Sequence, residues 1–183
     1  MAYQLAMPDL LLDIEIAASP ERVWSVLTDF AAYPVWNPYQ TFEGRAEPFA
    51  ILQISSRDLT GRALQVFNAA IWKLEPSRKL ELLVGKLFWL ASRRIFHLDA
   101  VGDGMRLRHG LVFSGIASAW MSPSAQEMES LRPLYVAFGA ALKRRAEEST
   151  RAPPAKKSRP PPRQAEHARK LMNTRAASQS ERR

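Results

Sequence analysis

Three polar side chains lie in otherwise apolar stretches of the sequence, where they could do chemistry. Arg94 could bind a carboxylate or enolate oxygen, because a guanidinium carries a fixed charge and donates paired hydrogen bonds. His109 could act as a general base or donate a hydrogen bond to a ligand carbonyl. Asn68 could orient a ligand through its amide. Each also has a structural interpretation, which is a side chain reaching solvent for Arg94 and a hydrogen-bonded interior group for His109 and Asn68.

Aromatic side chains could form the wall and the entrance of a binding cavity. Those that could line such a cavity are Trp72, Phe88, Phe96, Tyr135 and Phe138. Trp36 and Tyr39 flank a proline and could form the lip of the entrance. The alternative for all of them is packing, either in the core or between the first helices and the sheet.

Other chemistries find no support in the sequence. The chain has no cysteine, which excludes a disulfide scaffold, an iron–sulfur cluster and a thiol nucleophile. It also lacks a histidine cluster with metal-ligand spacing, a glycine-rich phosphate loop and the serine-hydrolase motif. Asp99 and Asp103 fall at a predicted hairpin end, and His97 is expected to face outward. We therefore expect no metal and no cofactor, and no complete catalytic constellation is visible.

The first elements are a strand and two short helical segments. Residues 10–17 alternate between apolar and charged side chains, which predicts a half-buried strand. Ser19-Pro20-Glu21 is a strong helix start, with an N-cap, a proline in the first turn and an acidic residue. Tyr33-Pro34 and Asn37-Pro38 then break the helix into a short turn.

A period of two continues from Thr41 to Ser114 and predicts an antiparallel meander. The predicted strands lie near residues 40–46, 49–56, 62–74, 79–85, 87–100 and 104–114. In the last hairpin a two-residue loop would bring Arg94 and His109 to the same apolar face, with Arg108 facing water.

One long helix completes the predicted domain. Ser124 and Glu127 form a capping box, and about 25 residues of helix follow, to Glu148. An apolar stripe with helical spacing runs through Met128, Leu131, Tyr135, Phe138 and Leu142. A sheet with one apolar face needs this helix to cover it, so the fold class is α+β.

The opening of the chain resembles the SRPBCC superfamily, which includes START-like lipid-transfer domains, polyketide cyclases/dehydrases and birch-pollen-allergen-like proteins. The residues that carry the resemblance are Ile14-x-Ile16-x-x-Ser19-Pro20-x-x-Val23-Trp24-x-x-Leu27-x-Asp29-Phe30-x-x-Tyr33-Pro34-x-Trp36-Asn37-Pro38, with weaker matches at Leu80-Glu81-Leu82, from His109 to Gly115, and at Leu142-Lys143-x-x-Ala146-Glu147. The resemblance implies a helix-grip fold, in which a curved antiparallel sheet of six to seven strands wraps a long C-terminal helix, with two short helices after the first strand. It also implies an enclosed apolar cavity.

Two positions depart from the pattern of such relatives. The residue after His109-Gly110 is often acidic there and is Leu111 here, and a histidine near position 94 is common there and is Arg94 here. Both changes alter the polar groups that could do chemistry.

The charge of the chain divides it into parts. Residues 151–183 hold 10 of the 26 Lys+Arg but only 2 of the 18 Asp+Glu, which accounts for the whole net charge of +8. They hold no aromatic residue, so we expect a disordered basic tail over 150–183 after a domain at 10–149 and an extension at 1–9. The tail is interpreted as a solubilising end, with a localisation signal or a contact to an anionic surface as the alternatives. It has no aromatic side chain to stack on bases, so we expect no sequence-specific nucleic-acid partner.

The resemblance to the SRPBCC superfamily thus implies a protein that binds a hydrophobic small molecule or lipid in an internal cavity. The alternative is a polyketide cyclase/dehydrase-like enzyme acting in the same cavity, and a further one is an interaction protein that docks through its tail. No targeting or membrane-spanning segment is visible, which together with the absent cysteines favours a cytoplasmic location.

Overall fold

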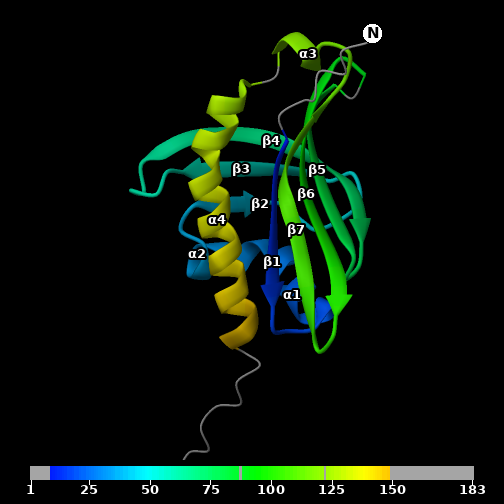
Figure 1. Cartoon of the computed structure of the whole chain (residues 1–183), viewed down its shortest axis with the longest axis vertical. Coiled ribbons are helices and arrows are strands. Elements are labelled where there is room, and N and C mark those ends of the chain that lie inside the picture. The colour runs from blue at the N-terminus through cyan, green and yellow to red at the C-terminus, as the bar shows by residue number, and fades with distance from the viewer. Residues whose placement is uncertain (1–8, 87, 122, 149–183) are drawn as a thin grey trace, which may run out of the picture. The chain divides into compact units, whose positions relative to one another are not determined.

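Seven strands form one curled antiparallel sheet (Figure 1). The computed structural model describes residues 9–86, 88–121 and 123–148. The strands are β1 (Leu10–Ile16), β2 (Gln40–Glu43), β3 (Ile51–Arg57), β4 (Ala63–Glu75), β5 (Lys79–Lys86), β6 (Leu90–Val101) and β7 (Gly104–Ser114). Their order in the sheet is β1-β7-β6-β5-β4-β3-β2, so the first strand closes beside the last.

The helices lie where the capping residues predict them. They are α1 (Pro20–Thr28), the 3-10 turn η1 (Phe30–Ala32), α2 (Tyr33–Trp36), α3 (Ser118–Met121) and α4 (Ala125–Glu148). The Ser19 hydroxyl accepts a hydrogen bond from the Arg22 amide at the start of α1. The Ser124 amide donates to the Glu127 carboxylate while the Glu127 amide donates to the Ser124 hydroxyl, which confirms the capping box before α4.

Helix α4 packs against β1, α1 and α2, and the sheet curls around it (Figure 1). The predicted stripe on α4 faces inward, with Met128, Tyr135, Phe138 and Leu142 buried and Leu131 partly buried. This arrangement confirms the α+β helix-grip fold, with short helices between the first two strands.

The β6–β7 hairpin has the predicted loop and register. Val101 pairs with Gly104, which leaves a two-residue turn at Gly102-Asp103, and Gly102 adopts the positive φ of 56° that such a turn needs. Arg94 and His109 consequently face the interior, and Arg108 faces water.

The structure corrects the predicted start of β6. This strand begins at Leu90 rather than near residue 87, and Phe88 lies in the preceding turn with 86% of its surface exposed. An apolar residue in a tight turn shows the same alternation as a strand residue, so the pattern did not separate them.

The interior consists of two apolar clusters rather than one. The larger joins α1, α2, most of the sheet and the C-terminal half of α4, including Leu27, Phe96 and Phe138. The smaller contains Leu10, Met128 and Tyr135. The predicted extension before Asp9 and the predicted tail at 150–183 lie outside the described residues.

Candidate functional site

A cavity of about 370 Å³ lies between the inner face of the sheet and the N-terminal half of α4. Side chains from β2 to β7 and from α4 form its wall. The lining residues are Gln40, Ile54, Ser56, Leu64, Gln65, Phe67, Ala69, Leu82, Val84, Ser92, Arg94, Leu111, Phe113, Pro123, Leu131, Leu134 and Tyr135. Its wall includes members of both apolar clusters, because the cavity occupies the place where helix and sheet do not meet.

Arg94 brings a buried positive charge to this wall. Only 8% of the residue is exposed, and its Nε and Nη2 atoms have no hydrogen-bond partner among the described residues. The guanidinium carbon lies 4.6 Å from the ring centroids of Tyr135 and Phe138 and 5.1 Å from that of Phe96. Burial lowers the pKa of Arg94, whereas Tyr135 and Tyr33 act in the opposite direction, and a guanidinium stays charged throughout the ordinary pH range.

His109 lies behind the cavity wall rather than on it. Its ring stacks on Phe96 and Tyr135, each with a centroid separation of 6.3 Å, and the residue is 1% exposed. Helix α4 passes close to it at Gly139, where an added Cβ would lie 2.8 Å from Nε2. Burial, together with the charge of Arg94, lowers the pKa of His109 to about 3, so the imidazole is neutral near pH 7. A neutral ring of this kind can orient its neighbours but carries no charge.

Neutral polar groups complete the wall. Gln40 on β2 is paired in register with Ser56 on β3, and both are buried. The Ser56 hydroxyl donates to the backbone carbonyl of Gln65, and Ser92 lies two residues before Arg94 on the same face of β6. Among the described residues of the wall there is no carboxylate and no histidine.

Two predicted site residues on β4 face away from the cavity. Asn68 is exposed on the outer face, while its neighbours Phe67 and Ala69 line the cavity. Trp72 lies at a bulge between Ile71 and Lys73 and is 36% exposed. The prediction chose the wrong face because the outward side chains of this strand are as apolar as the inward ones. Phe88, in its exposed turn, is also away from the wall.

The remaining predicted aromatics are interior or loop groups. Phe96 and Phe138 pack against each other with a centroid separation of 5.7 Å, and Trp36 packs on Phe138 at 5.9 Å. Tyr39 is partly buried in the loop before β2, where its carbonyl accepts a hydrogen bond from the Arg57 amide. Of the predicted residues, Arg94 and Tyr135 thus lie on the cavity wall.

Sequence reasoning missed most of the apolar wall. Leu111 and Phe113 lie two and four residues after His109 on β7 and so share its inward face, but they are absent from the predicted site, and Leu131 belongs to the predicted helix stripe. Leu111 is the cross-strand partner of Arg94, so the two positions that depart from the SRPBCC pattern are neighbours on one wall. The pairing of these two departures could therefore have pointed to this part of the cavity wall from the sequence.

Two further hollows lie around the C-terminal half of α4. One of about 690 Å³ is lined by Ile14, Ala17, Ala140, Lys143, Arg144, Glu147 and Glu148. One of about 500 Å³ lies beside it, between Lys143, the end of β1 and the turn of the β6–β7 hairpin. They are larger but more open, and four of the seven residues lining the first are charged. The more enclosed apolar cavity is therefore the better candidate for a small-molecule site.

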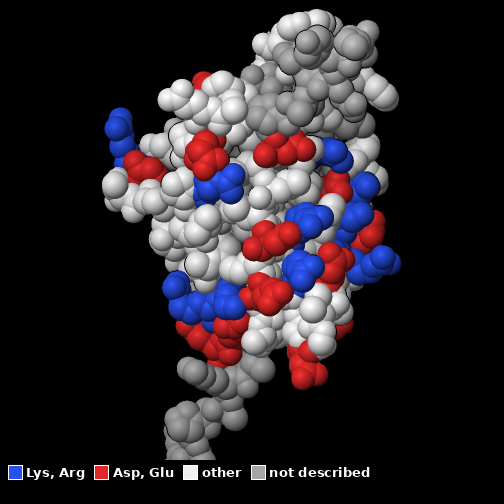
Figure 2. Space-filling view, in the orientation of Figure 1, with Lys and Arg blue, Asp and Glu red and all other residues white. Residues whose placement is uncertain are grey.

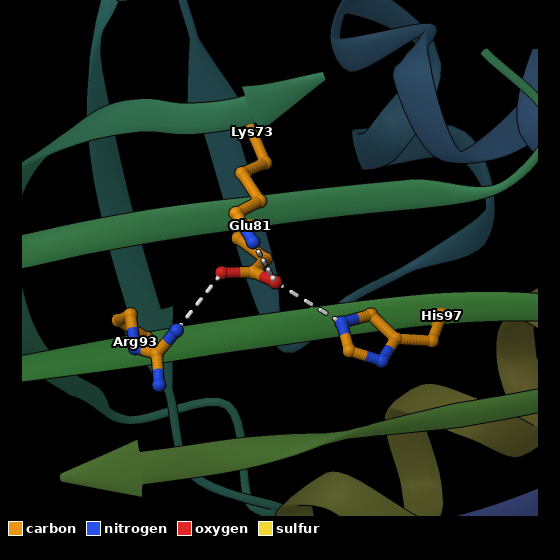
Figure 3. Close-up of polar contacts among 4 residues, drawn as sticks. All are labelled: Lys73, Glu81, Arg93 and His97. Carbon is orange, nitrogen blue, oxygen red and sulfur yellow. Dashed lines mark hydrogen bonds and ion pairs between the residues drawn. The ribbon is translucent and has the colours of Figure 1, made fainter. Parts of the chain in front are cut away.

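A second polar cluster lies on the outer face of the sheet (Figure 3). The Glu81 carboxylate is 3.2 Å from Arg93 Nη1, 3.2 Å from His97 Nε2 and 3.8 Å from Lys73 Nζ. Glu81 is only 3% exposed because these side chains cover it. His97 faces outward, as predicted, and the cluster ties β4, β5 and β6 together without touching the cavity.

The surface in Figure 2 shows acidic and basic side chains interspersed rather than gathered by sign. Ion pairs between β1 and β7 contribute to this pattern, with Asp13 bonded to Arg108 and Glu15 to Arg106. Within the described ranges, no three His, Cys, Asp or Glu side chains are grouped to hold a metal ion. No helix in the described part of the chain is long and apolar enough to cross a membrane.

The family model for polyketide cyclase / dehydrase and lipid transport matches residues 7–147. The chain belongs to this family. The match includes all of the strands and nearly all of α4, and therefore every residue of the cavity wall. None of the curated proteins searched matches the sequence.

Solved structures show the same fold at low sequence identity. A START superfamily protein from Mycobacterium smegmatis is 20% identical, with a TM-score of 0.58 over 76% of this chain and 97% of that one. The di-domain ARO/CYC StfQ from the steffimycin biosynthetic pathway is 15% identical, with a TM-score of 0.59 over 79% of this chain and 52% of that one. Ara h 8.0201 is 11% identical, with a TM-score of 0.58 over 76% of this chain and 97% of that one. At these identities the likeness concerns the fold.

Proposed function

We propose that this protein binds a hydrophobic small molecule or lipid in the cavity between the sheet and α4. The observation that carries the proposal is the cavity itself, about 370 Å³ with a mainly apolar wall drawn from six strands and a helix. Natural interiors are close-packed, so a void of this size beside well-packed clusters is a feature that needs an explanation. A bound apolar molecule would complete the contacts that helix and sheet do not make with each other.

The driving force for such binding is the removal of apolar surface from water. Each square ångström of buried apolar area contributes roughly 25 cal/mol, before the cost of immobilising the ligand. Leu111, Phe113 and Leu131 offer such surface on opposite sides of the cavity. The neutral polar groups of β2 and β3 can fix the orientation of the ligand.

A cyclase/dehydrase-like enzyme in the same cavity is the alternative, and the likeness to StfQ supports it. Its chemistry would depend on Arg94 stabilising an enolate, since the described wall offers no carboxylate or histidine as a proton acceptor. His109 is neutral but stands behind Tyr135 and Phe96. Binding without catalysis therefore has the stronger support.

The test is the binding of a small neutral apolar fluorophore, naphthalene, to the full chain. Val84 lines the cavity, so Val84→Phe fills part of it and is expected to weaken binding about tenfold or more. Val136→Phe, at an exposed position on α4, makes the same change outside the cavity and should leave the affinity unchanged. Equal affinities of all three proteins, or no binding to the wild type, would refute the proposal.

A further inference from the structure

The buried charge of Arg94 has no counterion in the described structure. No carboxylate among the described residues forms an ion pair with it, and its immediate surroundings are the rings of Phe96, Tyr135 and Phe138. The neighbouring Arg93, on the opposite face of β6, is by contrast paired with Glu81. The same strand thus carries one neutralised arginine and one that is not.

An unpaired buried cation is costly, and the aromatic rings offset only part of the cost. Cation–π contacts attract the guanidinium, and the hydroxyl of Tyr135 accepts a hydrogen bond from it, but this oxygen is neutral and the rings supply no anionic one. Nε and Nη2 accordingly remain without partners although both are buried. Proteins retain such a group where something else supplies the missing charge.

The place where that charge could enter is the cavity, because Arg94 is part of its wall. The other polar members of the wall are neutral amides and hydroxyls, among them Gln40, Gln65 and Ser92. These groups can hydrogen-bond to an oxyanion but cannot neutralise the arginine. The wall therefore combines an apolar majority with one fixed positive charge.

We propose that the ligand is an anionic amphiphile, with a carboxylate that pairs with Arg94 and an apolar body that fills the cavity. This inference rests on the function proposed above and names the chemical class of its ligand. A carboxylate fits because its two oxygens accept paired hydrogen bonds from a guanidinium. At about 30 Å³ per water-sized group, the cavity holds roughly a dozen non-hydrogen atoms, the size of decanoate.

Calorimetric titration of the full chain with three probes separates the two proposals. Decanoate carries both the chain and the charge, decanol carries the chain alone, and acetate carries the charge alone. We expect decanoate to bind roughly 10- to 100-fold more tightly than decanol, which is the usual strength of a charge-assisted hydrogen bond. Acetate should bind far more weakly than either, because it buries almost no apolar surface.

Two arginine variants provide the specific readout. Arg94→Met keeps much of the side-chain volume and removes the charge, so it should erase the preference for decanoate and leave decanol affinity nearly unchanged. Arg93→Met alters the adjacent residue on the outer face, away from the cavity, and should leave both affinities as in the wild type. A circular dichroism spectrum and an unfolding curve for each variant confirm that it is folded.

The results of these titrations distinguish a failure of the proposed anionic ligand class from a failure of the proposed binding site. If decanol and decanoate bind the wild type equally, or if Arg94→Met keeps the preference for decanoate, the anionic class is wrong while the apolar site stands. If neither chain-bearing probe binds, the cavity is no site for molecules of this size and both proposals fail. A preference for decanoate that only Arg94→Met abolishes supports both.

Discussion

The guanidinium carbon of Arg94 lies 4.6 Å from the centroid of the Tyr135 ring, and both side chains line the same cavity. One comes from the middle of the sheet and the other from the helix that covers it. The contact therefore joins sheet and helix at the edge of the cavity. It also holds the charge of Arg94 in place before any ligand arrives, which spares a ligand part of the cost of ordering the site.

Removing this charge is expected to stabilise the free protein. An unpaired buried cation carries a desolvation cost, so Arg94→Met should raise the free energy of unfolding by about 1–3 kcal/mol. Denaturant unfolding without ligand measures the change. A loss of stability would contradict this expectation and would show that the contacts of Arg94 with the aromatic rings outweigh its desolvation cost.

Because α4 approaches β7 closely at Gly139, a glycine-to-alanine change there should have the opposite effect on stability from the usual one. Alanine in place of glycine within a helix normally stabilises by roughly 0.5–1 kcal/mol. Here the new Cβ would lie 2.8 Å from His109 Nε2, and the ring is held between Phe96, Tyr135 and Phe138. Gly139→Ala should therefore destabilise the protein by about 1–3 kcal/mol.

A double-mutant cycle identifies the cause. In a His109→Ala background the same Gly139→Ala change should cost much less, because the clashing ring is gone. An equal cost in both backgrounds, measured by denaturant unfolding, would show that the contact with His109 is not responsible.

Stability should depend on pH through His109. Its pKa is about 3 in the folded protein and near 6.5 in the unfolded chain, so the unfolded state binds the extra proton between these values. The stabilising contribution of the neutral ring is complete above about pH 6.5 and is lost as the pH falls toward 3. The loss approaches about 1.4 kcal/mol per pH unit within the window.

The interval from about pH 6.5 to 5 is best for the measurement, because carboxylates remain ionised there. His109→Gln removes the titrating group and should flatten the profile of unfolding free energy in this interval. Wild-type and variant profiles of equal slope would contradict the assignment of this pH dependence to His109.

Breaking the outer-face cluster around Glu81 should reduce the stability of the fold more than breaking an exposed ion pair does. Glu81→Gln removes the negative charge that Lys73, Arg93 and His97 share, and we expect a loss of about 1–3 kcal/mol because Glu81 is buried while its partners are partly exposed. Glu15→Gln breaks an exposed pair with Arg106 and should cost less than about 0.5 kcal/mol. Thermal unfolding of both variants compares them, and equal losses would show that burial of Glu81 contributes nothing.

The sequence predicted the fold well where local chemistry determines an element. Ser19 and Ser124 start the two main helices, and the Gly102-Asp103 turn determines which side chains of β6 and β7 face inward. On β4 the outward residues Val66 and Trp72 are as apolar as the inward ones, so alternation alone did not assign a face. Tertiary pairing with β3 and β5 decided it instead.

The site was less predictable because a cavity is defined by what does not pack. Periodicity shows that Leu111 and Leu131 face inward, but not that a space separates them. That space depends on where α4 crosses the sheet, which in turn depends on close contacts such as Gly139 against His109. Arg94 was the exception, since a charged side chain on an apolar strand face is visible in the sequence itself.

A crystal structure of the full chain grown with decanoate tests the central claim most directly. The account predicts electron density for the alkyl chain between Leu111 and Leu131, with the carboxylate within hydrogen-bonding distance of Arg94. A structure in which side chains close this space, or in which decanoate lies only on the outer surface, would contradict it.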